Sequence, residues 1–201
     1  MAEATARPRG RPAAASRDDV LAAATEQFRA GDRIDLRAIA SGLGLGRATV
    51  YRWFGSRAEL IGEVLGMELA TLIAEARARA VGSGAEALLD TFDRMNRALA
   101  TAAPLRRFLE IERDAGLRLL TSSAGPVQPR AVDAIAALIE AEAEAEAGTY
   151  APAIEPRTLA YAIVRLYEAF VYNDAAAGIR GDIDRLREVE AALLGLAPRP
   201  V

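Results

Sequence analysis

The chain has 201 residues, of which 52% are hydrophobic, and a formal net charge of -3, so it can bury the core of one or two domains. It contains neither cysteine nor histidine, which excludes disulfides, thiolate nucleophiles, the usual zinc sites and the commonest general base. We expect no catalytic residue, no metal and no cofactor. Apolar runs are too short to span a bilayer and no signal peptide is visible, which predicts a cytoplasmic protein without a membrane partner.

The charge is distributed unevenly along the chain. Residues 1–60 hold ten arginines and seven acidic residues, whereas residues 61–201 hold fifteen arginines and twenty-one acidic residues. The N-terminal segment therefore carries a local charge of +3, and the C-terminal segment carries a local charge of -6. Such an asymmetry is typical of a small head that binds a polyanion and is attached to a larger body that does not.

The first fifteen residues are rich in Pro, Ala and Arg and have no helical periodicity, which predicts a flexible basic arm over residues 1–15. Within it the segment from Arg9 through Arg11 to Pro12 resembles an AT-hook core. In such an element two arginines lie in a narrow, A·T-rich minor groove. A disordered solubilising tail is an equally good interpretation of the same residues.

Capping residues and glycines then predict three short helices. Ser16 and Asp19 form a capping box for a helix over residues 17–30. A shorter helix follows Asp35, and a third covers about residues 46–53.

A second capping box, Ser56 with Glu59, opens a long helix that reaches about residue 81. Glycine and proline then divide the remainder into about six more helices, among them 129–147 and 156–176. The end of the 129–147 helix, where Ala and Glu alternate, is expected to be solvated. No strand periodicity is present, so we predict an all-α fold of about nine to ten helices.

The stretch LRAIASGLGLGRATVYRWFG, residues 36–55, meets the demands of two helices that cross steeply through a tight turn. The crossing needs a very small side chain, which Ala40 supplies, and the turn needs a glycine, which is Gly44. Small, hydroxyl, phenol and guanidinium groups on the outward face of the second helix suit the major groove of DNA. These outward residues are Arg47, Ala48, Thr49, Tyr51 and Arg52.

Residues 17–65, with IASGLGLGRATVYRWFGSRAEL at their centre, resemble the N-terminal domain of the TetR family of bacterial transcriptional regulators. The family joins a three-helix DNA-binding head, through a long fourth helix, to an all-helical domain for ligand binding and dimerisation. The resemblance implies a helix-turn-helix head over residues 16–62 and an effector-binding and dimerisation domain over residues 63–201. LRLLTSSAGPVQPR and LAYAIVRLYEAFVYND are also similar to a QsdR-like subgroup.

The motif and the resemblance together suggest residues that read bases. Arg47 and Thr49 are candidates for contacts to base edges, and Ala48 offers a methyl contact to thymine. Arg37 resembles a family position that reaches a base from the preceding helix. Gly46 stands where the family often has serine as the helix cap, but its backbone N–H groups can still meet a phosphate.

Other residues of this segment are expected to contact the DNA backbone. The predicted phosphate or sugar contacts are Tyr51, Arg52, Trp53 and Arg57. Trp53 has packing in the core as an equal alternative, and Arg29 and Arg33 are expected to be solvated surface.

The family resemblance implies a pocket for a small, mainly apolar effector between two segments of the body. Its predicted residues are Phe92, Met95, Leu99, Phe108, Tyr161, Arg165, Glu168 and Tyr172. Arg165 and Tyr172 are candidates for the group that orients an ester, lactone, amide or carboxylate. The alternative is that Arg165 pairs with Glu168 and only stabilises the structure.

We therefore predict a DNA-binding transcriptional regulator that acts as a ligand-responsive repressor. Its partners are a palindromic double-stranded DNA operator, a second copy of itself and a small-molecule effector. The resemblance implies that the helices 129–147 and 156–176 pack against their copies in a four-helix interface. A ligand-independent, nucleoid-type DNA-binding protein is the first alternative. A small helical enzyme is the second, but a phosphate loop, a nucleophile elbow and paired ligand motifs are all missing.

Overall fold

The computed structural model describes residues 15–145, 150–172 and 182–196. Within these ranges the chain forms ten α-helices and no strand, which confirms the predicted all-α class. The first four helices are α1 (Arg17–Arg29), α2 (Leu36–Gly42), α3 (Arg47–Phe54) and α4 (Arg57–Arg79). The other six are α5 (Gly84–Thr101), α6 (Ala103–Ile111), α7 (Arg113–Thr121), α8 (Gln128–Glu144), α9 (Pro156–Tyr172) and α10 (Ile183–Leu193).

Three of the predicted segments fall outside the described residues. Residues 1–14, which include Arg9 and Arg11 of the arm, are the first of them. The last residues predicted for two helices, 146–147 and 173–176, are the others.

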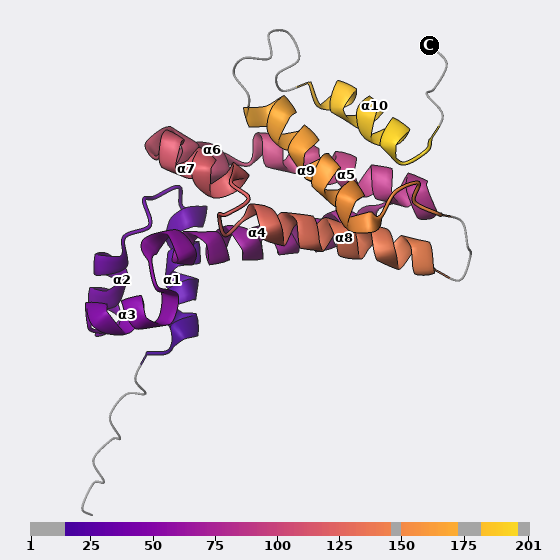
Figure 1. The fold of residues 1–201 in the computed structure, drawn as a ribbon. Helices are drawn as coiled ribbons and strands as arrows, with labels where there is room; N and C mark the ends of the chain where they lie inside the picture. The colour runs from indigo at the N-terminus through magenta and orange to yellow at the C-terminus, as the bar shows by residue number, and fades with distance from the viewer. Residues whose placement is uncertain (1–14, 146–149, 173–181, 197–201) are drawn as a thin grey trace, which may run out of the picture.

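The helices form a small head and a larger body that share one long helix. In Figure 1 the helices α1 to α3 make the head at the lower left, and α4 runs from the head along the underside of the body. The helices α8 and α9 lie over the far end of α4, with α5 and α10 behind and above them, whereas α6 and α7 lie closer to the head. The predicted boundary between residues 62 and 63 falls inside α4, so this helix belongs to both domains.

The head begins with the predicted capping box. The backbone N–H of Asp19 donates to the Ser16 hydroxyl at 3.2 Å, and the Ser16 N–H donates to the Asp19 carboxylate at 2.7 Å. These bonds satisfy orphan N–H groups at the start of α1. One face of α1 then buries Val20, Ala24 and Phe28 in the head core.

The head core continues into the body without a break. Leu60, Ile61, Val64 and Leu65 of α4 belong to the same cluster of buried side chains as the head residues, and so do side chains of α6 and α7. The rings of Phe28 and Phe108 meet edge to face, with centroids 6.3 Å apart. The helices α6 and α7 are therefore packed into the same core as α1.

Gly62 allows α4 and the connection between α7 and α8 to approach closely. A Cβ atom at this position would lie 2.3 Å from two side-chain atoms of Pro126, far inside the contact distance of two carbon atoms. The missing side chain at Gly62 therefore allows Pro126 to pack directly against the backbone of α4.

The alternating Ala and Glu residues at the end of α8 are not all solvated, contrary to the expectation. Glu142 is only 6% exposed. Its carboxylate accepts a bond of 2.9 Å from the backbone N–H of Gly84, at the start of α5, and pairs with Arg77 of α4. Because Ser83 makes no side-chain cap of its own, Glu142 supplies the cap of α5 from another helix.

None of the helices in the described residues combines the length and the apolar character needed to cross a membrane.

Candidate nucleic-acid interface and ligand cavity

The helices α2 and α3 cross through a tight turn. The carboxylate of Asp35 caps α2 by accepting from the N–H groups of Arg37 at 2.7 Å and Ala38 at 3.3 Å. Ala40 at the crossing is 1% exposed. Gly44 in the turn has a φ of +65°, a conformation that glycine adopts without the steric cost of a Cβ atom. This arrangement is a helix-turn-helix.

The second of these helices, α3, has one buried face and one exposed face. Val50 and Phe54 point into the head core. Trp53 is partly buried and packs against the same core, which agrees with the packing alternative for this residue. The other side chains of α3 are exposed, except for the half-buried Thr49. The exposed ones are Arg47, Ala48, Tyr51 and Arg52.

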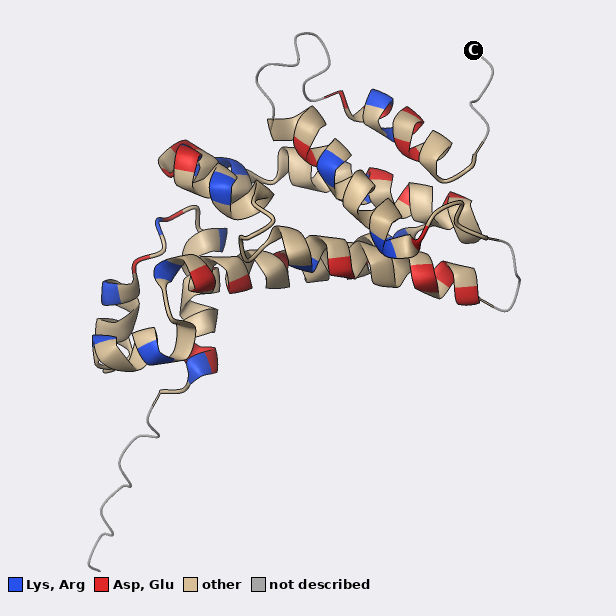
Figure 2. Cartoon of the chain, in the orientation of Figure 1, with Lys and Arg blue, Asp and Glu red and all other residues tan. Residues whose placement is uncertain are grey.

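The exposed face of α2 and α3 is basic. Residues 36–58 contain four arginines and no acidic residue, and Figure 2 shows blue without red along both helices. Among the residues that the structure describes, Arg47 and Arg52 have no ion-pair partner. Their guanidinium groups are therefore available to an external polyanion.

Gly46 is the N-cap of α3 and makes no side-chain cap. The first N–H groups of α3 consequently have no side-chain acceptor at this position, and they lie at the same end of the helix as the exposed Arg47. Backbone N–H groups at a helix start are good partners for a phosphate oxygen.

Arg57 lies at the start of α4 and is engaged inside the protein. Its Nε donates to the carbonyl of Ile34 at 2.8 Å, and its Nη1 donates to Glu112, between α6 and α7, at 2.8 Å. Arg33 donates to the same carboxylate at 3.1 Å. The bonds from Arg57 hold the pKa of Glu112 below its usual value. The predicted phosphate contact of Arg57 would require this junction between head and body to open.

Two further ion pairs fasten α1 to α4. Arg17 pairs with Glu63 at 2.5 Å and also lies over the ring of Phe54, and Arg29 pairs with Glu68 at 2.8 Å. The side chain of Arg29 is 60% exposed, so this pair is at the surface, where solvent screening leaves such contacts little effect on stability.

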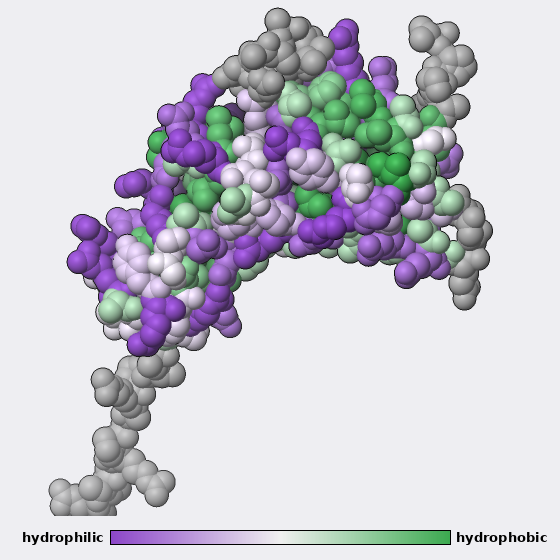
Figure 3. Space-filling model, in the orientation of Figure 1, coloured by the Kyte–Doolittle hydropathy of each residue, from purple (hydrophilic) through white to green (hydrophobic). Residues whose placement is uncertain are grey.

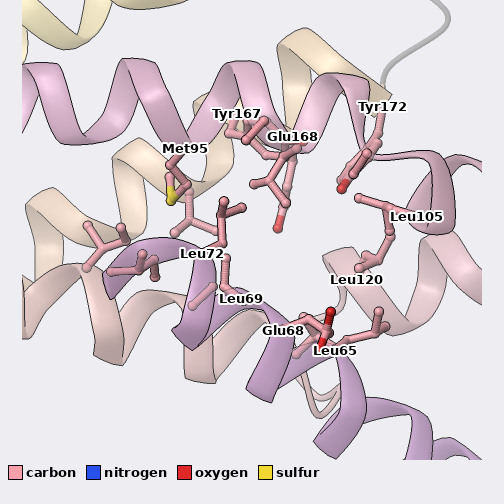
Figure 4. Close-up of a pocket in the computed structure, with 18 of the residues that line it drawn as sticks. Leu65, Glu68, Leu69, Leu72, Met95, Leu105, Leu120, Tyr167, Glu168 and Tyr172 are labelled. Carbon is pink, nitrogen blue, oxygen red and sulfur yellow. The ribbon is translucent and has the colours of Figure 1, made fainter. Parts of the chain in front are cut away.

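A cavity of about 330 Å³ lies in the body, next to the head. Of its 21 lining residues, 17 are apolar. They come from α1, from α4 to α9 and from the ends of adjoining connections. In Figure 4 the labelled side chains of α4 lie on one side of the cavity and those of α9 on the other. These residues are Leu65, Glu68, Leu69 and Leu72 of α4 and Tyr167, Glu168 and Tyr172 of α9.

The structure brings half of the predicted pocket residues to this cavity. Met95, Leu99, Glu168 and Tyr172 line it. The other four lie elsewhere. Phe92 is fully buried in the body core, Phe108 packs in the head core, and Tyr161 is 48% exposed. Arg165 lies outside the lining, where its Nη1 donates to the Thr121 carbonyl at 3.0 Å and to Glu168 at 2.7 Å.

The sequence predictions missed the contribution of α4 to the cavity. Leu65, Leu69 and Leu72 follow one another at helical spacing, which is the pattern of a buried stripe. This pattern is visible in the sequence, but it does not tell whether a stripe faces a core or a cavity.

Four polar residues interrupt the apolar lining. Glu168 is 8% exposed, and burial raises the pKa of its carboxyl. Tyr167 is also 8% exposed, and its hydroxyl makes no hydrogen bond of good geometry to the described residues. Burial raises the pKa of Tyr172 to about 12. The fourth is Glu68, the partner of Arg29.

No group of three or more Asp or Glu side chains among the described residues could hold a metal ion.

The comparisons with known proteins agree with this architecture. The model of the tetracyclin repressor-like C-terminal domain matches residues 83–195, more than half of the chain. The structure of the transcriptional repressor QsdR of the TetR family, from R. erythropolis, is 27% identical, with a TM-score of 0.83 over 92% of this chain and 97% of that one. The TetR family repressor AlkX from Dietzia sp. strain DQ12-45-1b, implicated in biodegradation of n-alkanes, is 23% identical, with a TM-score of 0.62 over 90% of this chain and 96% of that one. No curated protein matches.

The basic helix-turn-helix head on an all-helical body defines the class of DNA-binding transcriptional regulators. Within that class, the chain belongs to the TetR family. Membership of this family makes it a regulator and not an enzyme.

Proposed function

We propose that the protein is a repressor that binds a palindromic operator as a homodimer and is released from it by a small, mainly apolar effector. The observation that carries this proposal is that some buried side chains of the head core also line the cavity. Phe28, Leu65, Leu105 and Leu120 belong to the buried cluster of the head and also line the cavity. A molecule in the cavity therefore touches side chains of the same buried cluster that contains Val50 and Phe54 of α3. QsdR, which the chain resembles over most of its length, is a repressor.

The exposed side chains of α3 support two kinds of contact with DNA, to bases and to the backbone. We propose that Arg47 and Thr49, in the first turn, contact base edges, with Ala48 beside them for a thymine methyl group. Tyr51 and Arg52, on the same exposed face, are proposed to contact phosphate and sugar. Arg37 adds a further exposed guanidinium group from α2.

We propose that a ligand in the cavity changes the spacing of two heads in a dimer. The ligand has to bind one spacing better than the other, since equal affinity for both would leave the equilibrium unchanged. Arg57, Arg33 and Glu112 form the ionic junction that the head would have to strain or break in such a movement.

We expect the chain to form a homodimer through α8 and α9. One recognition helix reads only a few base pairs, and two-fold symmetry places two of them about 34 to 36 Å apart, one turn of DNA. Figure 3 shows apolar side chains, in green, gathered over the end of the body that carries α9 and α10. Ile154 before α9 and Tyr161 within it are 45% and 48% exposed. Light scattering without DNA at micromolar concentration should give twice the chain mass, and a monomer mass would contradict this expectation.

Footprinting separates this function from the nucleoid-type alternative. The purified protein is added to the DNA that flanks its own gene, and the cleavage pattern is recorded at rising concentration. A regulator protects one bounded palindromic site well before the rest of the DNA. Even coverage of the whole fragment would support packaging and would contradict our proposal.

A further inference from the structure

We propose that the cavity selects an apolar molecule whose polar end donates hydrogen bonds, a primary amine or an alcohol, and discriminates against the same molecule ending in a carboxylate. This inference rests on the proposed function, in which the cavity holds the effector. It names the chemical class of that effector and replaces Arg165 as the expected polar anchor.

The charged groups that line the cavity all have the same sign. They are the carboxyl groups of Glu68, from α4, and Glu168, from α9. The arginines that pair with them do not line the cavity. Arg29 has a side chain that is 60% exposed and Arg165 one that is 47% exposed, so both reach the carboxyl groups from the solvent side.

The α9 side of the cavity is built to accept hydrogen bonds. Glu168 already accepts from Nε2 of Gln128 at 3.0 Å and from Nη1 of Arg165 at 2.7 Å, but two carboxylate oxygens offer about four acceptor positions. The hydroxyl of Tyr167 is buried beside Tyr172, whose ring meets it edge to face, and the two phenols form no well-formed hydrogen bond. A buried polar group of this kind is stabilised by a partner, and a ligand in the cavity is in a position to supply one.

A carboxylate-ended ligand fits these groups poorly. Only the phenols of Tyr167 and Tyr172 have hydrogens to give it, and the ligand charge would sit in an apolar cavity that contains two carboxyl groups and no lining arginine. Repulsion between like charges is strong where the surroundings are apolar. An ammonium or hydroxyl group has hydrogens to donate, and its apolar chain is matched by the 17 apolar lining residues.

The experiment uses three probes with one and the same alkyl chain: decylamine, decanol and decanoate. Binding of each to the full-length protein is measured by calorimetry at pH 7, without DNA. We expect the amine and the alcohol to bind with one molecule per chain, and decanoate to bind at least about tenfold more weakly. Decanoate affinity equal to that of decanol, or no binding by any of the three, would overturn the proposal.

Variants show whether the carboxyl groups cause the preference. Glu168→Gln should lower the affinity for decylamine relative to decanol, and Glu68→Gln, which alters a more exposed side chain, is the second variant in case the first does not fold. Glu188→Gln is the matched control, because Glu188 is an exposed carboxylate on α10 away from the cavity lining. An unchanged ratio of amine to alcohol affinity in the folded cavity variants would contradict the assignment.

The outcome is separable from the proposed function. Selective binding of the amine and the alcohol by a protein that gives no bounded footprint would refute the regulator and leave the cavity preference standing. A clear operator footprint together with a preference for decanoate would support the regulator and refute the proposed cavity preference.

Discussion

Replacing Arg47 by alanine is expected to weaken operator binding by about 1 to 3 kcal/mol per half-site and to relax the base preference at the contacted position. Arg47 is the first residue of α3 and is exposed. Its planar guanidinium group matches the two hydrogen-bond acceptors on the major-groove edge of guanine. Since it has no ion-pair partner within the described ranges, its loss should leave folding unchanged. Fluorescence anisotropy on the operator and on single base-pair variants measures both effects.

Arg52→Ala is the matched control on the same helix. It should weaken binding to all sequences alike and reduce the slope of log affinity against log salt by about one unit for each copy in the complex. Arg57 is less suitable as the control, because its guanidinium group already donates hydrogen bonds to Glu112 and to the Ile34 carbonyl. A change of base preference in Arg52→Ala, with none in Arg47→Ala, would show that the two roles are assigned the wrong way round.

Glu190→Gln is expected to stabilise the protein by about 3 kcal/mol at pH 8 and to have little effect near pH 5. Glu190 of α10 is 0% exposed and burial raises its pKa to about 7, from an ordinary value of 4.5. The folded protein therefore holds the proton more tightly than the unfolded chain. Stability falls as pH rises from about 4.5 through about 7, and is then constant with respect to this group.

The surroundings of Glu190 show why a proton is favourable there. Nδ2 of Asn96 donates to Oε1 of Glu190 at 2.9 Å, while Oδ1 of Asn96 and Oε2 of Glu190 are buried without a partner among the described residues. A proton on Oε2 would give both atoms a bond, as in a carboxylic acid paired with an amide. Of the nearby charges, Asp93 adds to the rise in pKa and Arg187 opposes it.

Urea unfolding at pH 5.5 and pH 8 tests this expectation. The natural protein should be less stable at pH 8, and Glu190→Gln should lose most of this pH dependence, with a remainder from Glu168, whose pKa burial also raises. The exposed Glu188→Gln should behave like the natural protein. The absence of histidine removes the usual titration from this range. The same loss of stability in Glu190→Gln would place the titrating group elsewhere.

The head was predictable because its signals are local. Ser16, Asp35 and Ser56 each cap a helix that begins at the next residue, as expected from the sequence. Ala40 and Gly44 occupy the crossing and the turn for reasons that involve only their near neighbours. Such features depend on a few residues of sequence and need no knowledge of the rest of the fold.

The cavity was less predictable because its lining depends on distant partners. Tyr161 and Glu168 lie two turns apart on one stripe of α9, and nothing in that stripe distinguishes them. Gln128, at the start of α8, covers Glu168 and leaves Tyr161 exposed. In the same way the bonds of Arg57 depend on Glu112, which lies 55 residues further along the chain. Helical periodicity identifies a stripe but not what covers it.

The link between cavity and DNA is the central claim, and reciprocal binding tests it most directly. The affinity of the tightest of the three alkyl probes is measured for the free protein and for the protein saturated with its operator. Linkage requires that a ligand which weakens operator binding by some factor is itself bound more weakly, by the same factor, when operator is present. We predict such a loss, of about 5- to 150-fold. Equal probe affinity with and without operator would contradict the account.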